Sequence, residues 1–242
     1  MKIGLIDSGL GGITILNKLR ELNPKNDYLF FADQKNLPYG NKTKEELMRI
    51  TKNNINFLLA KGADRIFFAC NTISANCLEE IKELYPEVII SGIIDITCEL
   101  LTHSSYQRIL ILATEATINN GAYLRELNKV SQAELIPLAL PGLCKLIEDK
   151  ADRHVIANYL NDFLSDFTNV DAIVLGCTHY PLVADLISEI IEADIFDSIM
   201  ALEDSELLQG TGNGTLVIYS SGDKNLFEHK LEDFFHMSVK VQ

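Results

Sequence analysis

Tryptophan, a Cys-x-x-Cys spacing and any apolar run of membrane-spanning length are all missing from this 242-residue sequence. Its five cysteines are odd in number, which argues against a disulfide framework and against a zinc knuckle. The opening from Met1 to Asp7 is apolar for only a few residues before an acid, unlike a secretory signal peptide. These absences predict a cytoplasmic protein with reduced thiols and no membrane partner.

Basic residues are also scarce, with 21 Lys and Arg against 34 Asp and Glu and a formal net charge of -13. A chain of this charge repels phosphate backbones, and no stripe of lysines or arginines offsets the repulsion locally. Nucleic acid is therefore not expected as a partner. Hydrophobic residues make up 47% of the chain, enough to bury one large core or two small ones.

Short apolar runs alternate with amphipathic stretches along the whole chain, a pattern typical of βαβ units. The runs that predict strands lie at Lys2 to Ile6, Tyr28 to Ala32, Arg65 to Ala69, Val88 to Ile93, Arg108 to Ala113, Glu134 to Ala139, Ala172 to Leu175 and Leu216 to Ser220. Helices are expected to begin near Gly12, Thr43 and Ser74, and to cover Asn119 to Val130, Arg153 to Phe167, Tyr180 to Glu192, Ala201 to Leu208 and Lys224 to Phe235. Thr43 and Glu46 have the spacing of a capping box.

The pattern occurs twice, which predicts an α/β protein of two similar lobes with mainly parallel sheets and an active site in the cleft between them. The first lobe is expected to comprise residues 1–96 and 205–242, and the second residues 97–204. The chain would cross between lobes near Asp95 to Thr97 and near Glu203 to Ser205.

Two cysteines stand at matching places in the two halves. Cys70 follows an apolar run and precedes Asn71-Thr72, and Cys177 follows another and precedes Thr178-His179. The crevice beyond the carboxyl ends of parallel strands is where open α/β folds bind ligands. Two thiols facing one pocket from opposite sides suit inversion of a carbon centre, which needs a base on one face and an acid on the other.

Other interpretations of these residues stay open. A single cysteine at a buried strand end is more often a core residue than a catalyst, and Cys77, Cys98 and Cys144 are best explained by packing. Cys177 and His179 have the spacing of half a metal site, but no second pair at ligand spacing accompanies them, so no metal site is predicted.

The glycines after the first strand do not form a dinucleotide fingerprint, because Thr14 occupies the place of the final glycine in G-x-G-x-x-G. Asp7, just before them, has the alternative role of capping the following helix. Glu148 lies in Glu148-Asp149-Lys150, which is also typical of a solvated helix end.

Five short sequence motifs occur along the chain. They are Asp7-Ser8-Gly9-Leu10-Gly11-Gly12, Pro38-Tyr39-Gly40, Ala69-Cys70-Asn71-Thr72-Ile73-Ser74-Ala75, Gly176-Cys177-Thr178-His179-Tyr180-Pro181-Leu182 and Ser221-Gly222-Asp223. Together and in this order they resemble the glutamate racemases of the cofactor-independent aspartate/glutamate racemase superfamily. The resemblance implies interconversion of L- and D-glutamate for peptidoglycan synthesis, without pyridoxal phosphate, any other cofactor or metal, and commonly as a homodimer.

The resemblance also implies roles for individual residues. Cys70 and Cys177 would exchange the proton, with Asp7 beside Cys70 and with Glu148 and His179 beside Cys177. The motifs contain no arginine, so hydroxyls, an amide and backbone N–H groups at helix starts would hold the anionic substrate. The implied substrate-binding residues are Asp7, Ser8, Tyr39, Gly40, Asn71, Thr72, Thr114, Thr117, Thr178 and His179.

Three alternatives to a glutamate racemase stay open. One is a racemase of another amino acid such as aspartate, and the second is a racemase-like binding or regulatory protein that contacts a partner such as DNA gyrase. The third is a cysteine hydrolase that pairs one thiol with His179.

The chain departs from the family pattern at Asp95-Ile96, where Glu-Pro is usual, and at Asn120, where a serine is common.

Overall fold

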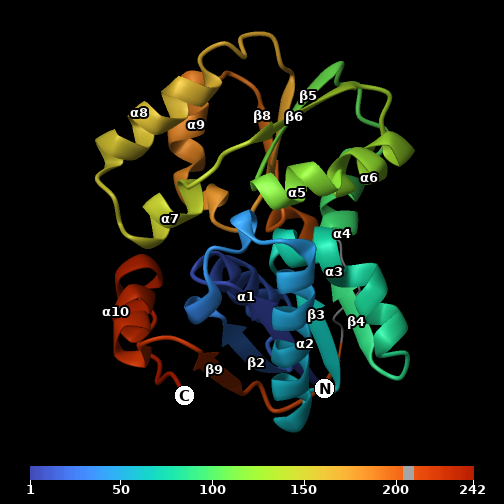
Figure 1. The fold of residues 1–242 in the computed structure, drawn as a ribbon, viewed down its shortest axis with the longest axis vertical. Coiled ribbons are helices and arrows are strands. Elements are labelled where there is room, and N and C mark those ends of the chain that lie inside the picture. Colours follow the sequence, from blue (N-terminus) through green and yellow to red (C-terminus); the bar gives the residue numbers. More distant parts are fainter. Residues whose placement is uncertain (204–209) are drawn as a thin grey trace.

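The computed structural model describes residues 1–203 and 210–242, and two all-parallel sheets organise them (Figure 1). The first sheet has the strand order β4-β3-β1-β2-β9, and the second has the order β6-β5-β7-β8. Helices flank both sheets, so the α/β fold of two parallel-sheet lobes is confirmed. The last strand, β9, pairs with β2 and returns the chain to the first sheet.

The strands of the first sheet are β1 (Lys2–Asp7), β2 (Asp27–Ala32), β3 (Arg65–Phe68), β4 (Ile89–Gly92) and β9 (Leu216–Ser220). Those of the second are β5 (Arg108–Ala113), β6 (Glu134–Ala139), β7 (Ala172–Gly176) and β8 (Asp194–Asp197). The α-helices are α1 (Gly11–Leu22), α2 (Lys44–Ala60), α3 (Asn71–Leu84), α4 (Ile94–Glu99), α5 (Glu115–Asn120), α6 (Ala122–Val130), α7 (Leu143–Glu148), α8 (Arg153–Leu164), α9 (Ala184–Ile190) and α10 (Lys224–Phe235). Short 3-10 helices lie at Gln34–Asn36, Tyr39–Asn41, Tyr180–Val183 and Met200–Leu202.

Local sequence explains most of these boundaries. The capping box before α2 is confirmed, since Thr43 Oγ1 accepts from the Glu46 backbone N–H and Glu46 Oε2 accepts from the Thr43 N–H. The expected helix from Asn119 to Val130 is instead two helices, α5 and α6. They are divided at Gly121, whose φ of 73° lies in the left-handed region that glycine adopts without strain.

Two further expectations differ from the structure. Strand β8 was not expected from the sequence, because its two apolar residues stand between acids and give no strand pattern of their own. The expected helix from Tyr180 begins as a 3-10 turn and becomes α9 only at Ala184. The expected helix from Ala201 to Leu208 and the expected crossing near Glu203 to Ser205 fall partly on residues 204–209, outside the described residues.

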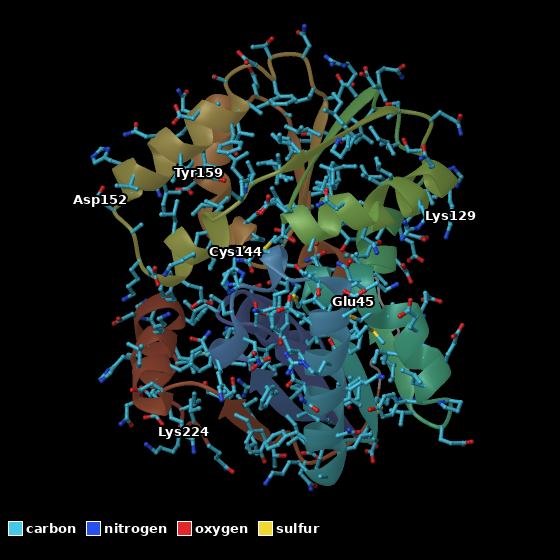
Figure 2. The ribbon with its side chains drawn as sticks, in the orientation of Figure 1. Glu45, Lys129, Cys144, Asp152, Tyr159 and Lys224 are labelled. Atoms are coloured by element: carbon cyan, nitrogen blue, oxygen red, sulfur yellow. The ribbon has the colours of Figure 1, made fainter. Side chains whose placement is uncertain are left out.

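The core runs through both lobes. One cluster of buried residues joins the inner faces of the two sheets and includes Leu5, Phe67, Ile111 and Val174. Two outer clusters pack helices against the opposite faces, and side chains fill the space between ribbons throughout (Figure 2). Strands covered on both faces explain the unbroken apolar runs in the sequence. Within the described ranges, no helix has the length and apolarity needed to cross a membrane.

Register brings the chemically important strand ends together. Ile6 of β1 pairs with Phe68 of β3, so Asp7 and Cys70 both follow at the carboxyl edge of the first sheet. Ala113 of β5 pairs with Gly176 of β7, so Thr114 and Cys177 follow at the same edge of the second sheet. The two edges face each other across the junction of the lobes, near the level of Cys144 (Figure 2).

Candidate functional site

A small cavity lies where the two sheet edges meet. The space among its wall atoms is about 280 Å³ when the part open to solvent is counted, but the centre of a water molecule has only about 10 Å³ in which to move. Both lobes contribute to its wall, which is formed by Ser8, Pro38, Tyr39, Gly40, Cys70, Asn71, Thr72, Thr114, Cys144, Cys177, Thr178 and His179. The structure therefore places the two motif cysteines in one shared cavity.

Cys70 enters the cavity from the first lobe, between the end of β3 and the start of α3. Burial and the charge of Asp7 raise the pKa of its thiol well above the ordinary value. The backbone N–H groups of Ile73 and Thr72 act in the opposite direction, because they stabilise the thiolate at the helix start. The raised pKa favours the neutral thiol, which has thiolate-stabilising groups beside it.

Cys177 enters from the second lobe, after β7. Its Sγ lies 3.3 Å from Sγ of Cys144 and 3.9 Å from Nδ1 of His179. Burial and the neighbouring Cys144 thiol raise the pKa of Cys177 well above the ordinary value, and His179 acts to lower it. Each of the two motif thiols therefore has its own ionisable neighbour, Asp7 for Cys70 and His179 for Cys177.

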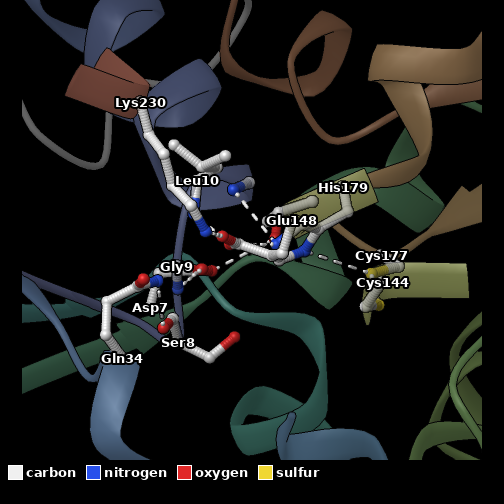
Figure 3. Close-up of polar contacts among 12 residues, drawn as sticks. Asp7, Ser8, Gly9, Leu10, Gln34, Cys144, Glu148, Cys177, His179 and Lys230 are labelled. Carbon is white, nitrogen blue, oxygen red and sulfur yellow. Dashed lines mark hydrogen bonds and ion pairs between the residues drawn. The ribbon is translucent and has the colours of Figure 1, made fainter. Parts of the chain in front are cut away.

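Glu148 holds the imidazole of His179 in place (Figure 3). Glu148 Oε1 lies 2.9 Å from His179 Nε2 and accepts from the Leu10 N–H at 2.6 Å, and Lys230 Nζ donates to Oε2 at 3.0 Å. The side chain is only 2% exposed, so the interpretation of Glu148 as a solvated helix end is wrong. The network joins four parts of the chain, since Leu10 precedes α1, Glu148 ends α7, His179 follows β7 and Lys230 lies on α10.

The charges in this network support one another. Burial alone would raise the pKa of Glu148, but His179, the Leu10 N–H and Lys230 together lower it to about 2. Burial acts to lower the pKa of His179, yet its hydrogen bonds to Cys177 and Glu148 raise it well above the ordinary value. His179 is therefore held as an imidazolium, with Nε2 toward Glu148 and Nδ1 toward Cys177.

Neutral donors line the rest of the cavity or lie directly behind its wall. Thr72 Oγ1 and Thr117 Oγ1 lie 3.0 and 2.9 Å from Thr114 Oγ1 in a chain of hydroxyls. Asn71 Oδ1 accepts from the Tyr123 hydroxyl at 2.6 Å, while its Nδ2 is buried without a hydrogen-bond partner among residues 1–203 and 210–242. A buried donor of this kind is costly unless a ligand accepts from it. The arrangement fits an anionic ligand.

A model of the Asp/Glu/hydantoin racemases matches residues 15–203. A glutamate racemase of Aquifex aeolicus is 37% identical over 227 residues, which cover 90% of this chain and 88% of the relative. The chain belongs to the Asp/Glu/hydantoin racemase family. The resemblance found in the sequence is thus confirmed.

Solved structures of this racemase family agree with the fold. The glutamate racemase of Francisella tularensis in complex with D-glutamate has a TM-score of 0.87 and 28% identity, with 99% of this chain and 95% of that chain covered. An aspartate racemase of Picrophilus torridus has a TM-score of 0.58 and 19% identity over 84% of this chain and 93% of that chain, a likeness of fold alone.

Three residues that the racemase resemblance implied do not line the cavity themselves. Asp7 lies behind it and accepts from Thr178 Oγ1 at 3.1 Å and from the Gly9 N–H at 2.9 Å, so it does not cap α1. Thr117 contacts the wall residue Thr114, and Glu148 contacts the wall residue His179.

Tyr39 lines the cavity, but its hydroxyl points away from it and forms hydrogen bonds with Asp33 at 2.7 Å and Asn54 at 3.1 Å. The departures at Asp95-Ile96 and Asn120 are not part of the wall.

Sequence reasoning missed Cys144, which it assigned to packing. Cys144 is half-buried, lines the cavity and touches the sulfur of Cys177. One signal was available, because Cys144 lies four residues before Glu148 and therefore on the same face of a helix. That signal becomes informative only once Glu148 is known to be buried beside His179.

Glycines of the first lobe allow this close approach of the second lobe. A Cβ atom on Gly11 would lie 2.3 Å from Thr178 Oγ1 and 2.7 Å from the Thr178 backbone carbon. A Cβ atom on Gly40 would lie 2.7 Å from Cβ of Thr114. A side chain at either position would hold the two sheet edges apart.

We expect Gly11→Ala to lower kcat/KM by about 100-fold, because a displacement of about 1 Å in a catalytic arrangement has an effect of this size. Steady-state racemisation assays measure the loss. Gly11 stands at the start of α1, where alanine suits the helix, so the far-ultraviolet circular dichroism spectrum should not change. Wild-type kcat/KM in this variant would show that the lobes need not approach as closely as in the structure.

Proposed function

We propose that this protein is a glutamate racemase that interconverts L- and D-glutamate by two-base proton transfer and supplies D-glutamate for peptidoglycan synthesis. The observation that carries the proposal is the shared cavity of Cys70 and Cys177, which come from different lobes. The glutamate racemases among the relatives support the choice of substrate. The catalytic residues are Cys70, Cys177 and His179, which line the cavity, and Asp7 and Glu148 act from behind its wall as positioning residues.

The reaction needs one thiolate and one thiol at a time. The thiolate removes the α-proton from one face of the substrate, the electron pair stays on the α-carbon, and the opposite thiol donates its proton to the other face. The two sulfurs have then exchanged protonation states, so the same pair serves the reverse direction. Asp7 and His179 stand beside opposite sulfurs and assist the proton movement on their own side.

Substrate binding rests on dipoles and hydroxyls. No lysine or arginine belongs to the described wall of the cavity, while the wall includes Asn71, Thr72, Thr114 and Thr178. Asn71 and Thr72 stand in the first turn of α3, where free N–H groups carry partial positive charge. The buried Nδ2 group of Asn71 would gain its missing acceptor from a substrate carboxylate.

The structure is closed around this site. A space of about 10 Å³ for a water-sized sphere holds roughly one water and not an amino acid. The sheet edges must therefore separate to admit glutamate and approach again for the reaction. The closed form excludes water, which strengthens the electrostatic stabilisation of the carbanion-like intermediate.

We expect Thr72→Ala to raise KM for glutamate by about 10-fold, the value of one hydrogen bond to a charged group. The hydroxyl lies in the chain with Thr114, which remains paired with Thr117 in the variant. Thermal unfolding should change little by comparison. An unchanged KM would remove Thr72 from the substrate-binding residues, and Thr178→Ala provides a parallel test on the other lobe.

Incubation of L-glutamate in D2O tests the proposed function. A two-base racemase predicts deuterium at the α-carbon, measured by mass spectrometry, together with D-glutamate, measured by chiral chromatography. Turnover of aspartate in preference to glutamate would change the substrate assignment. A covalent acyl-enzyme without α-deuterium would instead indicate a cysteine hydrolase.

The proposal includes a cytoplasmic location and a homodimer. All five cysteines are free thiols, as expected for a reducing compartment. Sedimentation velocity of the purified protein tests the dimer, which would sediment at twice the chain mass of 27.0 kDa.

A further inference from the structure

We propose that Cys144, Cys177 and His179 form a binding site for a thiophilic divalent cation such as Zn²⁺, and that the bound cation blocks racemisation. The first part concerns three side chains of this chain and holds whatever the substrate is. The second part rests on the proposed function, because it follows from the use of the Cys177 sulfur as a base.

The distances suit a tetrahedral ion. One ligand atom from each of the three residues lies within 4.8 Å of the other two. The two sulfurs are 3.3 Å apart, and Cys177 Sγ is 3.9 Å from His179 Nδ1. A tetrahedral zinc ion with ordinary bond lengths separates two sulfurs by about 3.8 Å and a sulfur from a nitrogen by about 3.5 Å. These two separations differ from the ideal values by about half an ångström, and the Cys144 sulfur, which lies within 4.8 Å of the imidazole nitrogen, would also have to approach it.

The surroundings of His179 are those of a metal ligand. Its Nε2 is held by Glu148 Oε1 at 2.9 Å, which leaves Nδ1 directed to Cys177 Sγ (Figure 3). A carboxylate on the far nitrogen of a histidine is the usual outer partner of a metal-binding imidazole, because it fixes the ring and increases its basicity. Glu148 is itself held by the Leu10 N–H and Lys230.

The ion would have an open fourth position. Cys177 and His179 line the cavity together with Cys144, so the remaining position faces the space that holds substrate. Zinc with three protein ligands and a free site is a common arrangement. Binding replaces the proton of each thiol and the Nδ1 proton of the His179 imidazolium, so one divalent ion binds two thiolates and a neutral imidazole and releases three protons. Cys177 in this form can neither accept nor donate the α-proton.

This assignment reverses one sequence inference. The sequence predicted no metal site, because Cys177 and His179 have the spacing of only two ligands and no second pair at ligand spacing accompanies them. Helix α7 provides the third ligand from a distant part of the chain, and the same helix carries Glu148. Cys77 is also buried and free but belongs to no ligand group among the residues that the structure describes, so it serves as a matched control.

The direct test is Co²⁺ binding to the purified protein under a phosphine reductant, followed by sulfur-to-cobalt charge-transfer absorption. Wild type should bind one Co²⁺ with this absorption, and Zn²⁺ should displace it. Cys144→Ala should weaken Co²⁺ binding by at least about 10-fold, and Cys144→Ser by a similar factor, because even outer partners of a metal site have effects of this size. Cys77→Ala should bind as wild type does.

Zn²⁺ inhibition is then measured for each variant against its own metal-free racemase activity. The concentration that halves the activity should rise at least about 10-fold in Cys144→Ala and stay unchanged in Cys77→Ala. The absence of charge-transfer absorption in wild type, or equal Co²⁺ affinity in folded Cys144→Ala and Cys144→Ser, would overturn the metal site. Cobalt binding without any glutamate turnover would leave the site standing and refute the proposed function instead.

Discussion

Replacing Cys70 or Cys177 with serine is expected to lower the rate of glutamate racemisation by about 100-fold or more. General acid–base groups contribute effects of about this size, and a serine hydroxyl is a far weaker base than a thiolate. Both cysteines line the cavity, so each substitution removes one of the two proton carriers. Circular dichroism at the absorption of the amino acid follows interconversion in both directions.

The two variants should differ in one informative way. Cys70→Ser keeps the base on the Cys177 side, which can still exchange the α-hydrogen of one enantiomer with D2O without inverting it. Cys177→Ser should exchange the hydrogen of the other enantiomer. Loss of exchange from both enantiomers in both variants would contradict independent bases on opposite faces.

Cys98→Ser is the control for these substitutions. Cys98 is a buried free thiol on α4 and does not line the cavity. Its replacement should leave racemisation within about twofold of wild type, since it carries no proton in the reaction. A loss as large as that of Cys70→Ser would show that burial of a hydroxyl, and not removal of a base, explains the effect.

Glu148→Ala is expected to destabilise the protein by about 3 kcal/mol, the lower end for breaking a buried ion pair. The substitution leaves His179 without the carboxylate that holds its Nε2 and leaves the Leu10 N–H without its acceptor. It also frees Lys230, which is 16% exposed and can regain water only in part. Urea unfolding measured by fluorescence or circular dichroism gives the free energy.

Asp149→Ala is the matched control for Glu148→Ala. Asp149 is the next residue and forms an ion pair with Lys145 in which both side chains are more than half exposed. Its loss should change the free energy of unfolding by about 1 kcal/mol at most. Equal effects of the two substitutions would mean that the Glu148 network adds nothing to stability. Glu148→Gln, which keeps an acceptor for Leu10, should fall between them in stability.

Much of the fold could be predicted because its signals are local. The strands β5, β6 and β9 and the helix α10 have the predicted ends, since each apolar run or cap is readable in a few neighbouring residues. The split at Gly121 and the strand β8 were not predicted. A glycine is compatible with a continuous helix, and β8 is a strand only because β7 pairs with it.

The candidate site was also only partly predictable from the sequence. Cys70 and Cys177 were recognisable, since each ends a buried strand and precedes polar residues in a nearly repeated string. The role of Tyr39 differs from expectation, because its hydroxyl pairs with Asp33 and Asn54 on other elements. Nothing in the neighbourhood of Tyr39 in the sequence indicates that pairing.

The sequence by itself determined the α/β class, the two cysteine-ended strands and the family, because strand periodicity and motif order are properties of adjacent residues. Only the tertiary structure decided that Glu148 is buried on His179 and that Cys144 touches Cys177. Those contacts join residues 31 and 33 positions apart, between α7 and the turn that follows β7. Packing of α7 beside the end of β7 within the second lobe, which no local pattern encodes, therefore set the chemistry around the second thiol.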